Sequence, residues 1–114
     1  MPYIEVKVTK ELDDPTRSKL KDELGKIICN IPGKSEAVTM IGLLGSIDLY
    51  KGGKRLTDGA YIEVKTYTET ARIHKEKVNK EIFKLLNNLL SIPAANVYIT
   101  FYDHKEWGYD GNLI

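Results

Sequence analysis

The chain has 114 residues, the usual size of one domain and too few for two independent cores, so we expect a single domain over residues 1–114. Its 17 Lys and Arg residues nearly balance 16 Asp and Glu residues, and a net charge of +1 gives no field that would hold a nucleic acid or a membrane surface. No apolar run reaches the roughly 18 residues that span a bilayer, and a signal peptide is not evident, so we expect a cytoplasmic protein without a membrane or nucleic-acid partner.

The first predicted element is a strand over residues 3–8. Apolar residues at positions 4, 6 and 8 alternate with Glu5 and Lys7, which is the period of a strand with one buried face. A helix follows, because Asp14 offers a capping oxygen and Pro15 suits the first helical position. Its apolar residues at 20, 24, 27 and 28 form one stripe.

The next segment, AVTMIGLLG at residues 37–45, is apolar on nearly every residue and predicts a central strand covered on both faces. Cys29, the only cysteine, falls in the apolar pattern of the preceding helix. We therefore expect it to be a buried thiol in a reducing compartment.

The second half repeats this order. The pentapeptide YIEVK of residues 3–7 returns at 61–65, a helical pattern occupies residues 70–91, and a last strand follows Ile92 and Pro93. Helices of this length between strands imply parallel crossovers, so the sequence predicts an α+β fold of two β-α-β repeats. Both helices should lie on one face of a four-stranded sheet, and we expect the open face to pack against copies of the chain. The linker at 47–59 and the tail should add short edge strands.

Pro2 is the first candidate for chemistry. Methionine aminopeptidase removes an initiator Met before proline, so we expect Pro2 to become the N-terminal residue, with a secondary amine. Burial and a nearby cation would both disfavour the protonated amine and leave a base near neutral pH. Taken alone, the proline favours a residue that only permits Met removal or begins an edge strand.

Five short elements occur in order along the chain. They are Met-Pro before a strand, Gly-Lys at 33–34, Gly-Gly at 52–53, NVYITFYD at 96–103 and WGYDGNLI at 107–114. In these elements and their spacing the chain resembles the macrophage migration inhibitory factor family, part of the tautomerase superfamily, over essentially its whole length. The resemblance implies a homotrimer of two β-α-β repeats per subunit, with active sites between subunits.

The resemblance also implies roles for particular residues. Pro2 would be the catalytic base and Lys34 the cation that engages a substrate carboxylate, although Lys34 has an alternative role as a solvated lysine at a helix end. The other implied pocket residues have ordinary packing as their alternative. They are Tyr3, Lys65 and Tyr67 from the same subunit, Tyr98 and Thr100 from the neighbour, and Trp107, Tyr109 and Ile114 on an apolar wall.

The implied activity is that of an isomerase, a keto-enol tautomerase of 2-keto acids such as phenylpyruvate, without cofactor or metal. The alternative is a cytokine-like binding or signalling protein with a vestigial proline pocket. Tyr67 stands where the family has an aliphatic residue and Thr100 where it often has Asn, so the substrate stays open. Cys29 has no cysteine partner, so we expect no thiol oxidoreductase activity.

Overall fold

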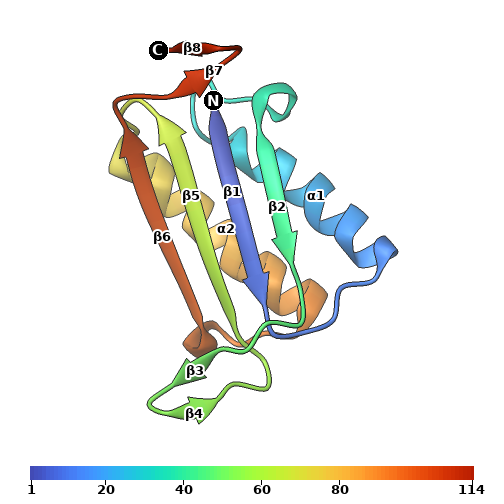
Figure 1. Ribbon diagram of the computed structural model, residues 1–114. Helices are drawn as coiled ribbons and strands as arrows, with labels where there is room; N and C mark the ends of the chain where they lie inside the picture. Colours follow the sequence, from blue (N-terminus) through green and yellow to red (C-terminus); the bar gives the residue numbers. More distant parts are fainter.

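The computed structural model describes all residues, 1–114, as two layers: a four-stranded sheet and two helices that cover one of its faces (Figure 1). The main elements are β1 (Pro2–Val8), α1 (Asp14–Ile28), β2 (Met40–Leu44), β5 (Ala60–Tyr67), α2 (Arg72–Leu90) and β6 (Val97–His104). The short strands are β3 (Tyr50–Lys51), β4 (Lys54–Arg55), β7 (Gly108–Tyr109) and β8 (Asn112–Leu113). Single 3-10 turns, Glu36–Val38 and Ala94–Asn96, precede β2 and β6.

The strand order is β2-β1-β5-β6. Within each half the two strands are parallel, and the halves join through the antiparallel pair of β1 and β5. The repeated YIEVK segments are therefore neighbours, and Glu5 lies opposite Glu63 at the centre of the pair. This arrangement confirms the prediction of two β-α-β repeats with both helices on one face.

The core fills the space between the sheet and the helices. The strands contribute Ile4, Val6, Val8, Ile62 and Val64, and the helices contribute Leu20, Leu24, Ile28, Val78, Ile82 and Leu86. The spacing explains this packing, because alternate strand residues and residues three or four apart on a helix share one face. None of the helices is long and apolar enough to cross a membrane.

The position predicted for β2 is wrong, because β2 is an edge strand and not a central one. Ile41 and Leu43 pack against the helix side of the core, whereas Met40 and Leu44 are exposed, Met40 by 71%. A run that is apolar on both faces thus identified the strand but not its place in the sheet.

Two further predictions about α1 are also wrong. The N-cap residue is Asp13, whose backbone is extended and whose Oδ1 accepts a hydrogen bond from the Thr16 N–H at 2.9 Å, while Asp14 is the first helical residue. Cys29 is exposed, because it follows the last helical residue and lies outside the buried stripe; its Sγ contacts the Gly25 carbonyl oxygen at 3.3 Å.

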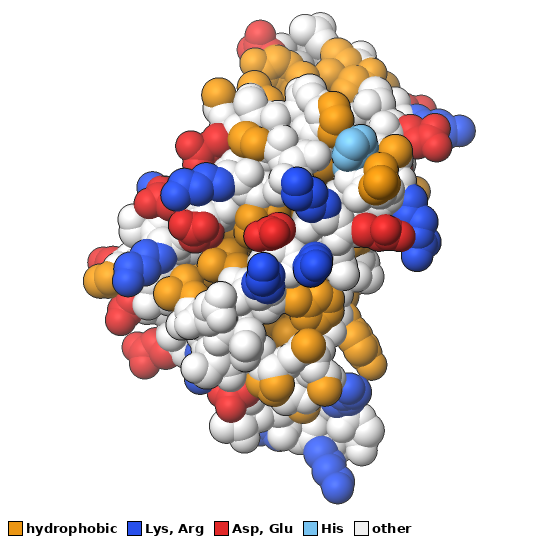
Figure 2. Space-filling view, turned by 180° about the vertical axis from the view of Figure 1, so that it is seen from behind, with side chains coloured by type: hydrophobic (Ala, Val, Ile, Leu, Met, Phe, Trp, Pro, Cys, Tyr) orange, Lys and Arg blue, Asp and Glu red, His pale blue; other side chains and the backbone are white.

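The open face of the sheet is less apolar than expected. Lys7 pairs with Glu5 at 3.5 Å, and Lys65 pairs with Glu63 at 3.3 Å. The aliphatic residues of β1 and β5 face the helices instead, so the hydrophobicity of these two strands does not require the open face to be covered. The outer side of the helices mixes basic and acidic side chains, as in a solvated surface (Figure 2).

The two short hairpins lie at opposite ends of the sheet. The tail hairpin β7-β8 is next to the N-terminus, and the linker hairpin β3-β4 is at the far end (Figure 1). The prediction of short strands in both segments is therefore confirmed. Whether they reach across a subunit boundary stays a prediction.

The capping assignment predicts different effects of neighbouring substitutions. Asp13→Ala should lower the Tm by about 3–6 °C, because the Thr16 N–H loses its acceptor, whereas Asp13→Asn keeps an acceptor and Asp14→Ala removes none. The hydrogen bond from Thr16 lowers the pKa of Asp13 below 3.8, so the charged cap stabilises the folded state above that pH. The Tm difference between wild type and Asp13→Ala should therefore shrink as the pH falls below about 4 in thermal unfolding followed by circular dichroism. An equal loss for Asp14→Ala would contradict the assignment.

Candidate active site

The N-terminal residues lie at one end of the central strand pair. Pro2 is buried and stands opposite Thr66 in the register of β1 and β5. The Met1 carbonyl continues the ladder by accepting a hydrogen bond from the Tyr67 N–H at 3.2 Å. With Met1 attached, the Pro2 nitrogen is an amide, and the free amine of the chain belongs to Met1.

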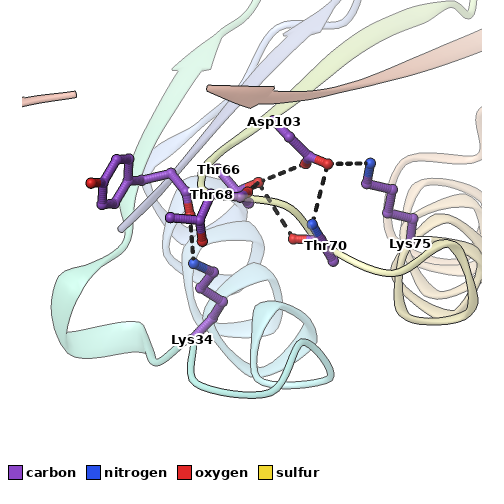
Figure 3. A network of polar contacts seen from close by, with 7 residues as sticks. Lys34, Thr66, Thr68, Thr70, Lys75 and Asp103 are labelled. Carbon is purple, nitrogen blue, oxygen red and sulfur yellow. Dashed lines mark hydrogen bonds and ion pairs between the residues drawn. The ribbon is translucent and has the colours of Figure 1, made fainter. Parts of the chain in front are cut away.

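Lys34 reaches the same place from the loop after α1. Gly33 has φ +80°, a left-handed conformation that glycine adopts without strain, and it turns the chain just before Lys34. The half-buried Lys34 donates a hydrogen bond from Nζ to the Tyr67 carbonyl oxygen at 3.0 Å, drawn as the dashed line from Lys34 in Figure 3. The backbone of Tyr67 therefore contacts both the N-terminal segment and Lys34.

This setting acts on the terminal amine. Burial, and then the neighbouring Lys34 ammonium, lower the pKa of the Met1 amino group below its ordinary value of 8.0. Both causes disfavour the positively charged form, because burial removes water and the lysine adds repulsion. Lys34 makes no ion pair with a carboxylate, so its charge is not neutralised.

A groove of about 660 Å³ opens beside Pro2. Its lining is mostly apolar and comes from both ends of the chain and from the segment before β2. The lining residues are Met1, Pro2, Tyr3, Ala37, Val38, Met40, Lys65, Trp107, Gly108 and Tyr109. A small molecule with an apolar body would fit such a surface.

Five of the predicted site residues line this groove: Pro2, Tyr3, Lys65, Trp107 and Tyr109. The prediction of a buried strand over residues 37–45 left out three lining residues, Ala37, Val38 and Met40. These three residues follow Lys34 closely in the sequence. That short distance along the chain indicates that they lie near the same opening as Lys34.

Tyr3 is held in one position within the groove. Its hydroxyl donates to Glu5 Oε1 at 3.1 Å, and it lies against Gly42, where an added Cβ would stand 2.5 Å from the hydroxyl oxygen. Burial, followed by the hydrogen bond to Glu5, raises the pKa of Tyr3 above 10.0. The phenol therefore stays protonated at neutral pH.

Lys34, Tyr67 and Ile114 lie close to this region but do not line the groove. The backbone of Ile114 pairs with that of Trp107 through hydrogen bonds of 3.1 and 2.8 Å, which hold the tail against itself. Ile114 thus supports the segment that carries Trp107, and its predicted place in the pocket wall is not found within one chain.

Tyr98 and Thr100 lie toward the other end of the sheet. Tyr98 is paired with Tyr61 in the register of β5 and β6, whereas the Pro2 end of β5 is paired with Asp103. Tyr98 is 62% exposed and lines a separate cavity of about 310 Å³, and the Thr100 hydroxyl contacts the Tyr61 hydroxyl at 3.1 Å. One chain therefore does not bring these two residues to Pro2.

An amine of lowered pKa and two phenols line the groove, and the unneutralised Lys34 lies beside it. No cluster of three or more His, Cys, Asp or Glu side chains is placed to hold a metal ion anywhere in the chain. The arrangement is suited to taking a proton from, and holding an anionic group of, a bound small molecule.

No protein-family model matches this sequence, and no curated protein matches it either. Solved structures, in contrast, match over the full chain. A structure of Leishmania major MIF2 is 25% identical, covers 100% of this chain and 97% of its own, and has a TM-score of 0.91.

Two other solved structures have the same fold. The macrophage migration inhibitory factor-like protein from Entamoeba histolytica is 21% identical over 99% of this chain and 98% of its own, with a TM-score of 0.86. Pt0534 inactivated by 2-oxo-3-pentynoate is 16% identical over 96% and 93%, with a TM-score of 0.84. The chain therefore has, over its whole length, the fold of the macrophage migration inhibitory factor family of the tautomerase superfamily, as the resemblance of its motifs implied.

Proposed function

We propose that the chain is a keto-enol tautomerase of 2-keto acids that uses the amine of Pro2 as its general base. The observation that carries this proposal is the position of the N-terminal strand, where a buried Pro2 that lines an apolar groove stands near an unneutralised Lys34. The proposal requires removal of Met1, because only then does the Pro2 nitrogen have a lone pair that can take a proton.

In this reaction the neutral amine takes a proton from the carbon next to the keto group and delivers it to the keto oxygen. The C–H electrons form the enol double bond, so no oxidant or cofactor is needed. The surroundings that lower the pKa of the Met1 amine would act on the Pro2 amine as well, because burial and Lys34 both disfavour the ammonium form.

Substrate binding would use the groups around Tyr67. Lys34 would hold the carboxylate with a charge-assisted hydrogen bond. Loss of Met1, which lines the groove, would remove the acceptor of the Tyr67 N–H and leave this donor free for a substrate oxygen. Tyr67 would thus contribute through its backbone, although the resemblance implied only a place in the pocket lining.

The relative Pt0534 adds support, because the compound that inactivated it, 2-oxo-3-pentynoate, is itself a 2-oxo acid. The apolar lining from Val38, Met40 and Trp107 favours a substrate whose remaining part is apolar, such as phenylpyruvate.

We also propose that the protein is a homotrimer whose active sites lie between subunits. Within one chain, Tyr98 and Thr100 are far along the sheet from Pro2, so they would reach a groove only on a neighbouring subunit. Tyr98 and Tyr102 are about two-thirds exposed, at 62% and 61%, and such large aromatic side chains are typical of interfaces.

The first test concerns Pro2. Pro2→Ala, retention of Met1 and an N-terminal tag should each remove most phenylpyruvate tautomerase activity, and the blocked forms should lose about 10²- to 10⁴-fold, the usual contribution of a general base. Because the amine pKa is lowered, the acidic limb of the kcat/KM profile should lie below the pKa of free proline. Intact mass and thermal unfolding provide the controls. Equal turnover by blocked and free forms that fold equally would overturn the proposal and favour a binding or signalling protein.

The second test concerns Lys34. Lys34→Ala should lower kcat/KM for a carboxylate substrate by about 10- to 150-fold, since a charge-assisted hydrogen bond contributes roughly 1.5–3 kcal/mol. The same variant should move the acidic limb to higher pH, because a repelling charge beside the amine is gone. Lys26→Ala, in the exposed last turn of α1, is the matched control. If Lys34→Ala treats an acid and its ester with unchanged relative efficiency, Lys34 does not bind the carboxylate.

The third test concerns the assembly. Light scattering should give about three times the chain mass of 12.9 kDa. Co-expression of a Met1-blocked chain with a Tyr98→Ala chain should give more activity than either alone, because an intact Pro2 would then meet an intact Tyr98 of a neighbour. A monomer at micromolar concentration, or no gain on mixing, would refute the shared site.

A further inference from the structure

A polar network lies behind the candidate site, between the ends of β5 and β6 and the start of α2 (Figure 3). Asp103 accepts from the Thr66 hydroxyl at Oδ1 (3.0 Å) and from the Thr70 N–H at Oδ2 (3.2 Å). The Lys75 ammonium donates to the same Oδ2 at 2.8 Å. Thr66 and Thr70 are buried, with exposures of 3% and 7%, and three donors hold the Asp103 carboxylate, whose side chain is 21% exposed.

The network is aligned with the N-terminal proline. Asp103 stands opposite Thr66 in the register of β5 and β6, and Thr66 stands opposite Pro2 in the register of β1 and β5. Directly opposite residues of an antiparallel pair have their Cβ atoms about 5 Å apart. The Thr66 side chain that Asp103 fixes is therefore the immediate neighbour of Pro2.

The chain between Thr66 and Thr70 has an unusual backbone. Thr68 has φ +73°, a left-handed conformation that a β-branched residue rarely adopts. Its N–H donates to the His104 carbonyl oxygen at 2.9 Å. Such a conformation persists only where the surroundings fix it, and the bonds from Thr66 and Thr70 to Asp103 fix the chain on both sides of Thr68.

This constrained turn, from Thr66 to Thr70, includes Tyr67, whose carbonyl oxygen is the acceptor for Lys34. The direction of that carbonyl depends on the backbone rotation between Tyr67 and Thr68. A change in the turn would thus move the anchor of Lys34, although Lys34 itself does not contact Asp103.

We propose that Asp103 is a positioning residue that, by clamping the turn from Thr66 to Thr70, directs the Tyr67 carbonyl toward Lys34 and so holds the lysine beside the N-terminal amine. The catalytic part of this inference rests on the proposed function, whereas the placement of Lys34 does not.

The charge of Asp103 is consistent with this role. Burial raises its pKa, but the hydrogen bond from Lys75, followed by those from Thr70 and Thr66, brings the pKa below 3.8, so the carboxylate stays ionised. An ionised carboxylate accepts all three donors at once. A neutral amide at this position has one acceptor oxygen instead of two, so it can accept from Thr70 and Lys75 only if its N–H groups turn toward the Thr66 hydroxyl, and it lacks the charge that attracts Lys75.

A first experiment measures the placement without using activity. The pKa of the N-terminal amine is determined by NMR titration of protein labelled at its first residue, with intact mass identifying that residue. Lys34→Ala should raise this pKa, and Asp103→Asn should move it at least halfway to the Lys34→Ala value. Asp58→Asn, which breaks an ion pair with Lys10 at the far end of the sheet, is the control and should leave it unchanged.

The result that overturns the proposal is an unchanged amine pKa in Asp103→Asn, or in Lys34→Ala. If Asp103→Asn does not fold, Thr68→Gly replaces it, since glycine retains the left-handed conformation but frees the turn. Thr68→Gly should then raise the amine pKa in the same direction, and no shift with this variant overturns the proposal as well.

A second experiment is a double-mutant cycle on kcat/KM for a 2-keto acid. Asp103→Asn should lose about 10- to 100-fold, because a displacement of about 1 Å in a contacting group can cost on the order of 100-fold. In a Lys34→Ala background the same substitution should cost much less, since its effect passes through Lys34. Equal losses in both backgrounds would show a merely structural role. If no variant turns over any 2-keto acid, the proposed function fails, and the amine titration still decides the placement of Lys34.

Discussion

The antiparallel pairing of β1 with β5 is the constraint on which the rest of the structure depends. It joins two nearly identical segments so that Ile4 lies opposite Val64 and Val6 opposite Ile62, and all four side chains face the helices. A slip of one residue would turn every one of these side chains to the open face, so the buried helix stripes exclude such a slip. The same register sets Pro2 beside Thr66 and Tyr3 beside Lys65.

The repeat produces two similar ends of the sheet, but only one of them carries the candidate site. Pro2 and the tail hairpin meet at one end, while Ala60 begins the second copy at the other end, near the linker hairpin (Figure 1). The asymmetry comes from the segments outside the repeat. Lys34 follows the first helix, whereas Ser91, with φ +54°, ends the second helix and leads to Pro93. The duplicated scaffold therefore has the groove at one end only, because the segments that adjoin its two ends differ.

The sequence predicted the element types and the layer arrangement, because alternation and helical spacing report directly which face is buried. It did not predict the edge position of β2, since Met40 and Leu44 are apolar without being covered in the single chain. Cys29 and Asp13 show the limit at helix ends, where a shift of one residue decides burial or capping. The parts of the site that depend on backbone direction, the Tyr67 carbonyl and the Thr68 turn, have no signature in the side-chain pattern.

The acceptor of Lys34 differs in charge from the acceptors of the other lysines near the candidate site. Lys65 and Lys75 are each within 3.3 Å of a carboxylate, so their charges are largely compensated. Lys34 is anchored instead by a neutral carbonyl, which fixes its position without cancelling its charge. A fixed and uncompensated cation lowers the pKa of the neighbouring amine and would also attract an anionic group. In the proposed reaction, a neutral amine and a carboxylate held close are the two conditions for proton abstraction from a 2-keto acid, and one carbonyl acceptor would provide for both.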